Sequence, residues 1–483
     1  MTEVKQEQSE LPKGWAETRI GDICNLINGR AFKPSEWTSN GVPIIRIQNL
    51  NDPKAEFNYC TFEVEEKYVV DNGQLLFAWS GTPGTSFGAH IWNRGKAVLN
   101  QHIFKVNINE DYFDKTFLKH LLNRNVKEYI GKAHGTAGLA HITKGKFEES
   151  QILLPSFNEQ KRIANKIEEL FSFLDAGVES LRKVQAQLKR YRQAVLKYAF
   201  EGKLTEEWRK THKEQIETAT KLLEKIEHKR KTIGLSPIDT FGLPKLPEGW
   251  YWARLSEMGT LDRGKSKHRP RDDKKLFGGT YPFIQTGEIR NSNGLITSFS
   301  QTYNETGLKQ SKMWLVNTLC ITIAANIAET ALLGVPACFP DSVVGFIADE
   351  EICEIKYVHF FIKSIKNRLA SYAPATAQKN INLAILRNLV APLASLQEQH
   401  KIVEEVERMF SIADEIEKIV ELSLKQSERL RQSILRKAFE GKLVPQYPND
   451  EPAEKLLERI KAERTKNRKT EVDNQVELIH YVK

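Results

Sequence analysis

The sequence predicts an α+β protein, in which two strand-rich mixed domains are joined by two long helices that form an antiparallel coiled coil with pseudo-twofold symmetry. The first observation is a repeat: Arg192–Leu204 reads RQAVLKYAFEGKL, and Arg431–Leu443 reads RQSILRKAFEGKL, 239 positions later (431 − 192). The second is a shared beginning, LPKGW at Leu11–Trp15 and LPEGW at Leu246–Trp250. The third is a heptad spacing of apolar residues that leads into each repeated block. The chain is therefore a duplicated unit.

Each half of the chain repeats one order of segments: the LPxGW motif, a variable stretch, a long amphipathic stretch, the EGKL motif and a short charged helix. The short helix is a third echo, Lys221–Ile226 against Lys455–Ile460. Two domains also suit the length, because 483 residues are too many for a single hydrophobic core. The predicted divisions are a first strand-rich domain at 1–157, a central long helix at 158–204, a short charged helix and linker at 205–245, a second strand-rich domain at 246–395, a C-terminal long helix at 396–443, and a short charged helix and tail at 444–483.

The composition indicates a cytoplasmic protein and is compatible with a polyanionic partner. The net charge is +9 and the pI about 9.0, which suits nucleic-acid binding without requiring it. Five cysteines form no CxxC pair, which favours a reducing compartment and argues against structural zinc. Met1–Glu10 is polar and predicts no signal peptide. Leu319–Phe339, the longest apolar run, is interrupted by Asn326 and Glu329 and predicts buried strands with a turn rather than a membrane span.

Apolar residues recur at steps of three and four through both long stretches, which predicts a heptad seam in each helix. A helix over Glu159–Phe200 would be roughly 60 Å long at ~1.5 Å per residue, which is longer than a globular core requires. Antiparallel packing of the two helices covers both apolar stripes, although each helix could instead pack on its own domain. Gly202 and Gly441 follow as C-terminal caps. The predicted seam consists of Ile167, Leu170, Leu174, Leu181, Val184, Leu188, Tyr191, Val195, Ile402, Val406, Met409, Ile416, Val420, Leu430 and Ile434.

Residues 16–157 and 251–395 alternate short β-branched and aromatic runs with turn residues, which predicts strands with a few helices. Similarity between these two stretches is mostly confined to such framework segments, as expected for domains that bind different ligands. The predicted strands include Val42–Ile47, Leu75–Trp79, Tyr281–Ile284 and Leu319–Ile323, and helices are expected near Phe117–Leu122 and Tyr357–Ile362.

The densest basic run in either domain is Arg263–Lys275, which Gly264 and Pro270 mark as a loop. Basic side chains on loops beside a β framework suit contacts with phosphates, and Arg or Lys also binds guanine in the major groove. A solvated charge run without function is the alternative. Polar clusters ahead of each long helix could reach base edges or could simply form turns. The candidate DNA-binding residues are Arg30, Lys33, Arg46, His141, Lys265, Lys267, His268, Arg269, Arg271, Lys274, Lys275, Gln378, Lys379 and Asn380.

Two catalytic patterns are interpreted as accidental. Gly259–Ser266 fits the GxxxxGK[ST] phosphate loop, but Lys-His-Arg-Pro-Arg follows where a helix must begin, and the first half has Arg30 and Ala31 in place of the Lys and Ser. Gly84–Gly88 fits GxSxG, yet a turn precedes it instead of a strand. The sequence has no HExxH motif, no zinc-spaced His and Cys, no amino-methyltransferase tetrad and no glycine-rich cofactor loop. The chain is therefore predicted to be non-catalytic and to bind no metal or cofactor itself.

The order of these motifs resembles the specificity subunit of type I restriction-modification systems: LPxGW heads each half, a proline loop leads to Glu-Gln at the start of a long helix, and RQxxLxxAFEGKL ends it. The resemblance covers nearly the whole chain. It implies that each strand-rich stretch is a target-recognition domain reading one half of a bipartite, asymmetric DNA target, while the helices set the spacer. The second proline loop, Ala391–Ser395, departs from the commoner Pro-Pro form, and Ser423 and Ser427 thin the second helix, which leaves the coiled-coil register open.

The resemblance also implies partners. Two modification subunits, which bind S-adenosylmethionine and methylate adenine, are expected to dock on the chain, and two restriction subunits are expected to supply the ATP- and magnesium-dependent motor and nuclease that act in defence against foreign DNA. No membrane contact is expected. The alternative is a coiled-coil scaffold or adaptor whose globular domains bind protein rather than DNA. The expected docking residues are Phe200, Glu201, Gly202, Lys203, Phe439, Glu440, Gly441 and Lys442.

Overall fold

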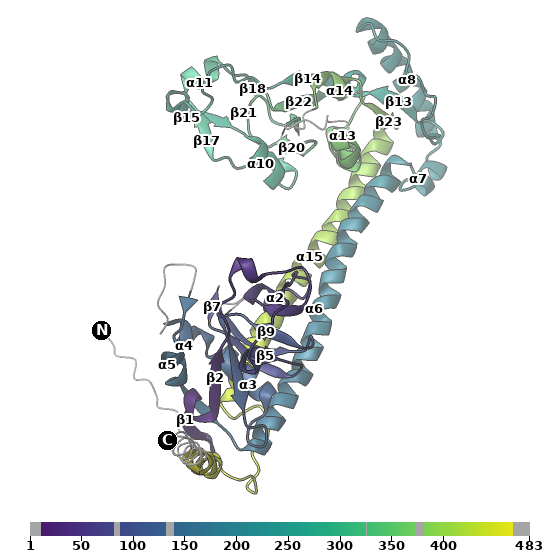
Figure 1. The fold of residues 1–483 in the computed structure, drawn as a ribbon. Helices are drawn as coiled ribbons and strands as arrows, with labels where there is room; N and C mark the ends of the chain where they lie inside the picture. Colours follow the sequence, from purple (N-terminus) through teal and green to yellow (C-terminus); the bar gives the residue numbers. More distant parts are fainter. Residues whose placement is uncertain (1–10, 82–86, 132–139, 325, 372–380, 467–483) are drawn as a thin grey trace, which may run out of the picture. The chain divides into compact units, whose positions relative to one another are not determined.

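The structure is a computed structural model that describes residues 11–81, 87–131, 140–324, 326–371 and 381–466 (Figure 1). The chain divides into two compact units. Unit 1 comprises Met1–Ser180 and Ser423–Lys483, and unit 2 comprises Leu181–Leu422. Two helices of 44 residues, α6 (Phe157–Phe200) and α15 (Leu396–Phe439), each begin in one unit and end in the other. The predicted pair of long helices is confirmed.

Unit 1 contains the first strand-rich domain. Its described strands are β1 (Ala16–Arg19), β2 (Cys24–Asn28), β3 (Val42–Ile45), β4 (Asn58–Cys60), β5 (Val69–Val70), β6 (Gln74–Ala78), β7 (Ser80–Gly81), β8 (Gly88–Trp92), β9 (Ala97–Leu99), β10 (Ile103–Ile108), β11 (Ala140–His141) and β12 (Gln151–Leu154). They form sheets of order β2-β10-β6-β8, β4-β3-β9-β5, β1-β12 and β11-β7. The helices of the domain are α1 (Ile20–Ile23), η1 (Pro34–Glu36), α2 (Ile47–Asn51), η2 (Glu66–Tyr68), α3 (Lys115–Arg124), α4 (Val126–Gly131) and α5 (Lys144–Glu148).

Unit 2 contains the second strand-rich domain. Its described strands are β13 (Tyr251–Arg254), β14 (Gly259–Arg263), β15 (Phe277–Phe283), β16 (Leu295–Ile296), β17 (Gln301–Tyr303), β18 (Met313–Trp314), β19 (Leu319–Thr322), β20 (Thr330–Leu333), β21 (Ala337–Cys338), β22 (Val343–Ala348) and β23 (Val390–Leu393). They form sheets of order β14-β22-β19-β20-β16, β17-β15-β21-β18 and β13-β23. The helices are α7 (Glu206–Thr211), α8 (Glu214–Thr232), α9 (Leu255–Met258), η3 (Lys274–Leu276), α10 (Thr286–Asn291), α11 (Glu305–Lys309), α12 (Ile355–Ser364), α13 (Lys366–Ser371) and α14 (Leu383–Arg387).

The two domains share one topology. The sheet β2-β10-β6-β8 corresponds strand by strand to β14-β22-β19-β20, and β4-β3-β9-β5 corresponds to β17-β15-β21-β18. Each second sheet contains a parallel pair, β3 with β9 and β15 with β21. Unit 2 adds β16 beside β20. The duplication of the sequence is therefore a duplication of the fold.

The local predictions made for the variable stretches are confirmed. Strands β3, β6, β15 and β19 overlap the predicted strands, and helices α3 and α12 cover the predicted helices. The apolar run Leu319–Phe339 contains the buried strands β19, β20 and β21. In the described parts of the chain, no helix is long and apolar enough to cross a membrane.

A large hydrophobic core in each unit includes helices that are distant in the sequence. In unit 1, Ile167 of α6, Ile434 of α15 and Ile460 of a helix at 453–466 pack with the domain. In unit 2, the end of α6, the start of α15 and helix α8 do the same. Burial of apolar surface at ~25 cal/mol per Å² drives this packing. Each short charged helix is thus packed on a globular domain.

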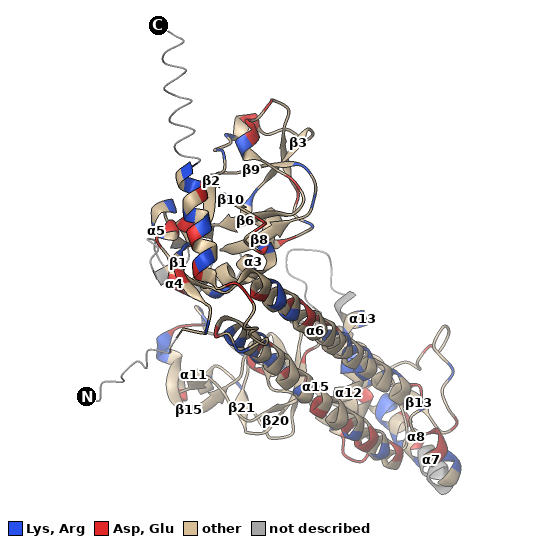
Figure 2. Cartoon of the chain, turned by 90° about the horizontal axis from the view of Figure 1, so that it is seen from below, with Lys and Arg blue, Asp and Glu red and all other residues tan. Residues whose placement is uncertain are grey.

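Within each unit, the segments of α6 and α15 run antiparallel. In unit 2 the last turns of α6 share a core with the first turns of α15, while Arg192 reaches Asp414 at 2.5 Å and Glu417 at 2.8 Å. In unit 1 the equivalent Arg431 pairs with Asp175. Arg431 is the repeat partner of Arg192 (431 − 192 = 239), and Asp175 is the repeat partner of Asp414 (414 − 175 = 239). Figure 2 shows charges of both signs along the two helices.

The seam prediction is wrong at three positions. Tyr191 is 41% exposed, Ile416 38% and Leu430 51%, whereas the other predicted seam residues are buried or half-buried. Each exposed residue directly precedes an ion-paired one, and consecutive residues of a helix point about 100° apart. Arg192 and Arg431 therefore take the positions between the helices. A strict heptad count misses this because a helix drifts ~20° per heptad from the 3.5-residue period.

The repeated motifs meet in one junction in each unit. In unit 1, Trp15 Nε1 of LPxGW donates to Glu159 Oε1 of the Glu-Gln pair at 3.1 Å. In unit 2, Trp250 Nε1 donates to Glu398 Oε2 at 2.9 Å. Both tryptophans and both carboxylates are buried. The start of each domain is thereby bound to the start of the long helix that follows it.

The glycine of EGKL lies against the proline of LPxGW. Gly202 and Gly441 have φ of +67° and +68°. A Cβ on Gly202 would lie 2.4 Å from Pro247 Cγ, and one on Gly441 would lie 2.8 Å from Pro12 Cβ. The left-handed backbone and the close approach both require glycine. The motif that first revealed the duplication is a structural joint.

The two junctions differ in charge compensation. Glu398 also accepts hydrogen bonds from Thr205 at 2.6 Å and from Arg209 at 2.8 Å. Glu159 instead accepts one from the amide of Gln446 at 3.3 Å. Burial raises the pKa of Glu159, although the hydrogen bonds from Trp15 and Gln446 counteract part of the increase. The unit 1 carboxylate is therefore the less well compensated of the two.

Candidate nucleic-acid interface

The basic loop of the second domain, Arg263–Lys275, begins where β14 ends and has a defined backbone path. The side chain of Gln310 accepts hydrogen bonds from the backbone N–H groups of Lys267 at 2.6 Å and His268 at 3.0 Å. Ser311 donates to a loop carbonyl at 2.8 Å. Segments after α11 therefore hold the loop beside the sheet.

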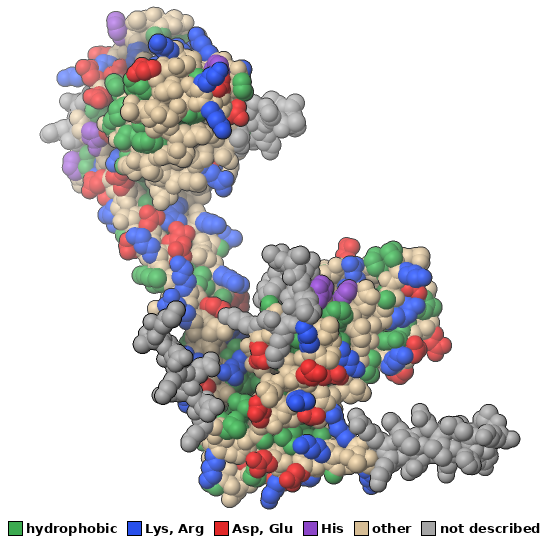
Figure 3. All heavy atoms as spheres, turned by 90° about the vertical axis from the view of Figure 1, so that its left-hand side faces the viewer, with side chains coloured by type: hydrophobic (Ala, Val, Ile, Leu, Met, Phe, Trp, Pro, Cys, Tyr) green, Lys and Arg blue, Asp and Glu red, His purple; other side chains and the backbone are tan. Residues whose placement is uncertain are grey.

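The cations of this loop fall into two groups. Arg271 pairs with Asp341 at 2.7 Å, and Arg269 lies 3.9 Å from the same carboxylate. His268 pairs with Asp273 at 2.9 Å. The second group is exposed and forms no ion pair with another described residue; it consists of Lys265, Lys267, Lys274 and Lys275. The charge of these four lysines is available to a phosphate, whereas the guanidinium of the exposed Arg263 donates to the backbone carbonyl of Asp341. On the face of the molecule drawn in Figure 3, Lys and Arg side chains are interspersed with acidic ones.

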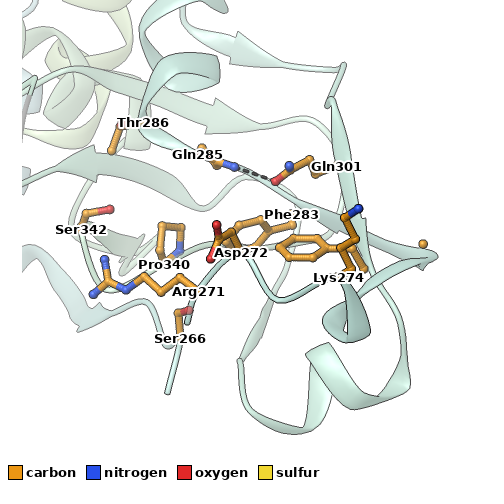
Figure 4. A pocket seen from close by; sticks show the side chains of 12 residues that line it. Ser266, Arg271, Asp272, Lys274, Phe283, Gln285, Thr286, Gln301, Pro340 and Ser342 are labelled. Atoms are coloured by element: carbon orange, nitrogen blue, oxygen red, sulfur yellow. Dashed lines mark hydrogen bonds between the residues drawn. The ribbon is translucent and has the colours of Figure 1, made fainter. Parts of the chain in front are cut away.

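A hollow of about 710 Å³ opens beside the basic loop (Figure 4). Arg271, Asp272 and Lys274 line it from the loop, and Gln285 and Gln301 line it from the sheet β17-β15-β21-β18 and the adjoining start of α10. Gln285 Nε2 donates to Gln301 Oε1 at 2.6 Å. Cationic, acidic and amide groups in one concave site provide the donors and acceptors with which base edges are read.

Sequence reasoning missed Gln285 and Gln301, although a signal for Gln285 was present. Val42–Arg46 reads VPIIR and Tyr281–Gln285 reads YPFIQ, 239 positions apart (285 − 46). Arg46 is a predicted DNA-binding residue, so the repeat offset alone would have pointed to Gln285. Gln301 carried no such signal, because its place next to Gln285 depends on the pairing of β15 with β17.

In the first domain, Arg30 is engaged within the protein. Its guanidinium pairs with Glu36 at 2.6 Å and lies 4.7 and 4.8 Å from the ring centres of Phe32 and Phe62. The hydrogen bond from Arg30 lowers the pKa of Glu36. This arginine holds the loop after β2 in place, and a direct DNA contact would require it to leave these partners.

The other candidates of the first domain are more accessible. Lys33 is exposed, and Arg46 is half-buried with its guanidinium 5.1 Å from the ring centre of Trp37. His141 of β11 is exposed, and its ring centre lies 6.2 Å from that of Trp79. The structure therefore places Arg46 and His141 beside two aromatic side chains that the sequence did not single out, Trp37 and Trp79.

Trp79 is the centre of a polar and aromatic cluster. Its Nε1 donates to Asn28 Oδ1 at 3.0 Å, and its ring centre lies 5.2 Å from that of His102. Gln101 lies beside His102, with Nε2 atoms 3.3 Å apart. Burial lowers the pKa of His102, and the nearby His141 lowers it further. A neutral imidazole, with one donor and one acceptor, is therefore favoured here.

The rejection of the phosphate loop is confirmed. Gly259–Arg263 forms strand β14, so the residues that would wrap a phosphate are extended, and no regular helix follows Ser266. Gly264 has a packing role, because a Cβ there would lie 2.3 Å from the carbonyl oxygen of Pro340. At the equivalent Gly29, an added Cβ would lie 2.1 Å from the carbonyl oxygen of Asn100.

Gln378, Lys379 and Asn380 lie outside the described residues, as does most of the GxSxG pattern. Within the described parts of the chain, no three His, Cys, Asp or Glu side chains are grouped to hold a metal ion.

The two aromatic docking candidates pack within their own units. Phe439 is buried, with its ring centre 5.5 Å from that of Phe117. The half-buried Phe200 lies 5.0 Å from Tyr357 and 5.4 Å from Phe361. These rings attach the helix ends to α3 and α12 of their own units, because an apolar side chain at the end of a long helix packs on the nearest core.

The remaining docking candidates differ in accessibility. Gly202 and Gly441 serve the junctions described above. The charged residues form short surface pairs, Lys203 with Glu201 at 2.6 Å and Lys442 with Glu440 at 3.1 Å. Both lysines are exposed, and a role for them in docking stays a prediction.

The fold and the site define a class of protein: one framework, present twice, carries two surfaces of different chemistry, as in a protein that recognises two different ligand elements. The family model of the type I restriction modification DNA specificity domain matches residues 12–189 and 247–426. The chain belongs to this family.

Individual relatives agree with the family match. The chain is 29% identical to the type I restriction enzyme EcoBI specificity subunit of Escherichia coli over 93% of this chain and 92% of that protein. It is 27% identical to the EcoDI specificity subunit of the same species, with 94% and 96% covered. Among solved structures, the HsdS subunit from Thermoanaerobacter tengcongensis has a TM-score of 0.55 at 19% identity over 90% of this chain and 99% of that chain. A chain from a structure of a type I R-M system has a TM-score of 0.68 at 18% identity, with 90% and 100% covered.

These findings settle the broad function. The chain is a specificity subunit, the component of a type I restriction-modification system that recognises DNA sequence rather than catalysing a reaction. The prediction that it is not itself an enzyme is confirmed. The adaptor alternative, in which the domains bind only protein, is set aside.

Proposed function

We propose that each strand-rich domain reads one half of a bipartite, asymmetric DNA target and that the paired helices fix the gap between the halves. The observation that carries the proposal is the shared framework with different exposed chemistry. Each domain is built from the equivalent set of strands. The second domain has a lysine-rich loop and an amide-lined hollow, whereas the first has Arg46 beside the ring of Trp37. Two readers of this kind select two different half-sites.

A connection of fixed length would make recognition depend on spacing. Both domains are packed on the same two 44-residue helices, and neither helix contains a proline. When two binding modules are linked without slack, both engage only if the distance between their sites is correct. The chain therefore selects the length of the gap as well as the half-sites.

The proposal includes two modification subunits that dock on this chain and bind S-adenosylmethionine to methylate adenine. Repetition of exposed apolar side chains supports two equivalent docking sites. Phe173 and Ile412 are 68% and 49% exposed and stand 239 positions apart (412 − 173), as do the exposed Tyr191 and Leu430 (430 − 191). Two equivalent docking sites on a duplicated scaffold would require exposed side chains that recur at the offset of the repeat, as these do. Two restriction subunits, with ATP and magnesium, would complete the complex in the cytoplasm.

Mapping of methylated adenines across the genome tests the proposal. Strains with and without this gene are compared, both carrying the modification subunit. We expect methylation that depends on the gene at one sequence with two defined halves and a gap of constant length. Methylation at a continuous sequence, or at half-sites with variable gaps, would contradict the division of labour between the domains.

A further inference from the structure

Arg46 and Gln285 occupy the same position in the two domains. Each follows the last residues of a central strand, β3 or β15, and each precedes a short helix, α2 or α10. The backbone N–H of Arg46 donates to Asn49 Oδ1 at 3.0 Å, and that of Gln285 donates to Glu288 Oε2 at 2.7 Å. The two residues are 239 positions apart (285 − 46), the offset of the repeat. The duplicated fold therefore presents one backbone site with two different side chains.

The environment of each side chain leaves hydrogen-bonding groups free. The Arg46 guanidinium lies 5.1 Å from the ring centre of Trp37 and forms no ion pair with another described residue. Gln285 donates to Gln301 at 2.6 Å, which leaves Gln285 Oε1 and Gln301 Nε2 without a partner among the described residues (Figure 4). An aromatic ring in one domain and a second amide in the other restrict the side chain to few orientations.

The two side chains suit different purines. A guanidinium donates twice and matches the two major-groove acceptors of guanine, O6 and N7. An amide both donates and accepts and matches adenine, which presents the N7 acceptor and the N6 donor. The linked amides of Gln285 and Gln301 offer one free acceptor and one free donor in the same hollow as the basic loop.

We propose that Arg46 and Gln285 are equivalent base-reading residues, and that Arg46 reads a guanine in one half-site while Gln285, together with Gln301, reads an adenine in the other. This proposal rests on the proposed function, in which each domain reads one half-site. The two half-sites then differ at this position because Arg46 and Gln285 are different side chains at equivalent backbone positions.

Reciprocal substitutions test the proposal. The full chain carrying Arg46→Gln or Gln285→Arg is expressed with its modification subunit, and methylated adenines are mapped. We expect Arg46→Gln to replace or relax one G·C pair in a single half-site, and Gln285→Arg to replace or relax one A·T pair in the other. The other positions and the gap stay as in the original target. Each variant serves as the control for the half-site read by the other domain.

Binding measurements with purified complexes keep the test decisive if a variant fails to methylate. Fluorescence anisotropy with duplexes changed one base pair at a time should show that Arg46→Ala and Gln285→Ala each lose about 5- to 150-fold of discrimination at one position. Equal loss for all sequences, with a lower salt dependence, would identify phosphate contacts and overturn the proposal. An unchanged target with full methylation would also overturn it.

The remaining outcomes separate this proposal from the proposed function. If both variants alter the same half-site, or either alters both, the assignment of one domain to each half-site fails. If each alters its own half-site but at a base pair of the other kind, the division between domains stands and the purine assignment is wrong. Arg19→Gln, an exposed arginine on the edge strand β1, is the matched control and should leave the target unchanged.

Discussion

Replacing the four free lysines of the second-domain loop should reduce the salt dependence of DNA binding. The variant carries Lys265→Gln, Lys267→Gln, Lys274→Gln and Lys275→Gln. These side chains are exposed and form no ion pair with a described carboxylate, whereas Arg271 is paired with Asp341 at 2.7 Å. Each phosphate neutralised by a protein cation contributes about −0.9 to the slope of log K against log salt. The four lysines together account for at most ~3.6 of that slope.

The size of this effect is measurable by anisotropy with a duplex carrying the mapped target. Between 50 and 200 mM salt, a slope smaller by ~3.6 means that the affinity of the variant falls about 150-fold less than that of the original chain. We expect this difference when all four lysines contact phosphates, and proportionally less when fewer do.

A charge-matched control separates the loop from net charge. Lysines that already pair with carboxylates within the chain are replaced by Gln, at the same cost of four positive charges: Lys210, Lys225, Lys401 and Lys418. The control should keep the original slope to within about 1. If loop variant and control change the slope equally, or the loop variant leaves it unchanged, the loop is a solvated charge run without a role in binding.

Four further changes test the scaffold. Glu398→Gln should lower the unfolding free energy by about 3 kcal/mol in chemical denaturation, because Arg209 loses a buried partner, whereas Glu159→Gln should be neutral or stabilising at pH 7. The pKa of Glu159 is raised in the folded chain, so its stabilising contribution is present below about pH 4 and lost as pH rises. The stability advantage of Glu159→Gln should therefore vanish in acid. An advantage that persists in acid would contradict the argument that burial of the ionised carboxylate costs stability. Gly202→Ala should cost at least about 1 kcal/mol in thermal unfolding from its left-handed φ alone, and unchanged stability would contradict the requirement for glycine at this joint. Matched four-residue insertions in α6, within Lys183–Lys189, and in α15 add ~6 Å and should lengthen the preferred DNA gap by one or two base pairs in methylation maps; an unchanged gap would contradict the spacer role.

Several features of the fold were predictable because they depend on local periodicity. The three- and four-residue spacing predicted α6 and α15, and alternating runs predicted β3, β6, β15 and β19. The register between the helices was less predictable. Tyr191 fits the heptad, yet Arg192 takes the position between the helices because Asp414 and Glu417 lie opposite it. A pattern read along one chain does not include the partner that lies across the pair.

The candidate site shows the same division. A basic run predicted the loop at Arg263–Lys275, but which of its cations are free depends on Asp341, 70 positions from Arg271. The internal repeat could have predicted Gln285 from Arg46, whereas Gln301 enters the hollow only through the pairing of β15 with β17.

The sequence by itself determined the duplicated order of segments, the long helices and the membership of a DNA-specificity family, because each of these is written in residues close together along the chain or in a motif repeated at a constant offset. Only the tertiary structure decided that the glycine of EGKL rests on the proline of LPxGW, that the Phe200 and Phe439 rings pack on α12 and α3 of their own units, and that Gln301 lies beside Gln285. These facts are contacts between distant segments, and side-chain burial and charge pairing are set by what folding brings within a few ångströms.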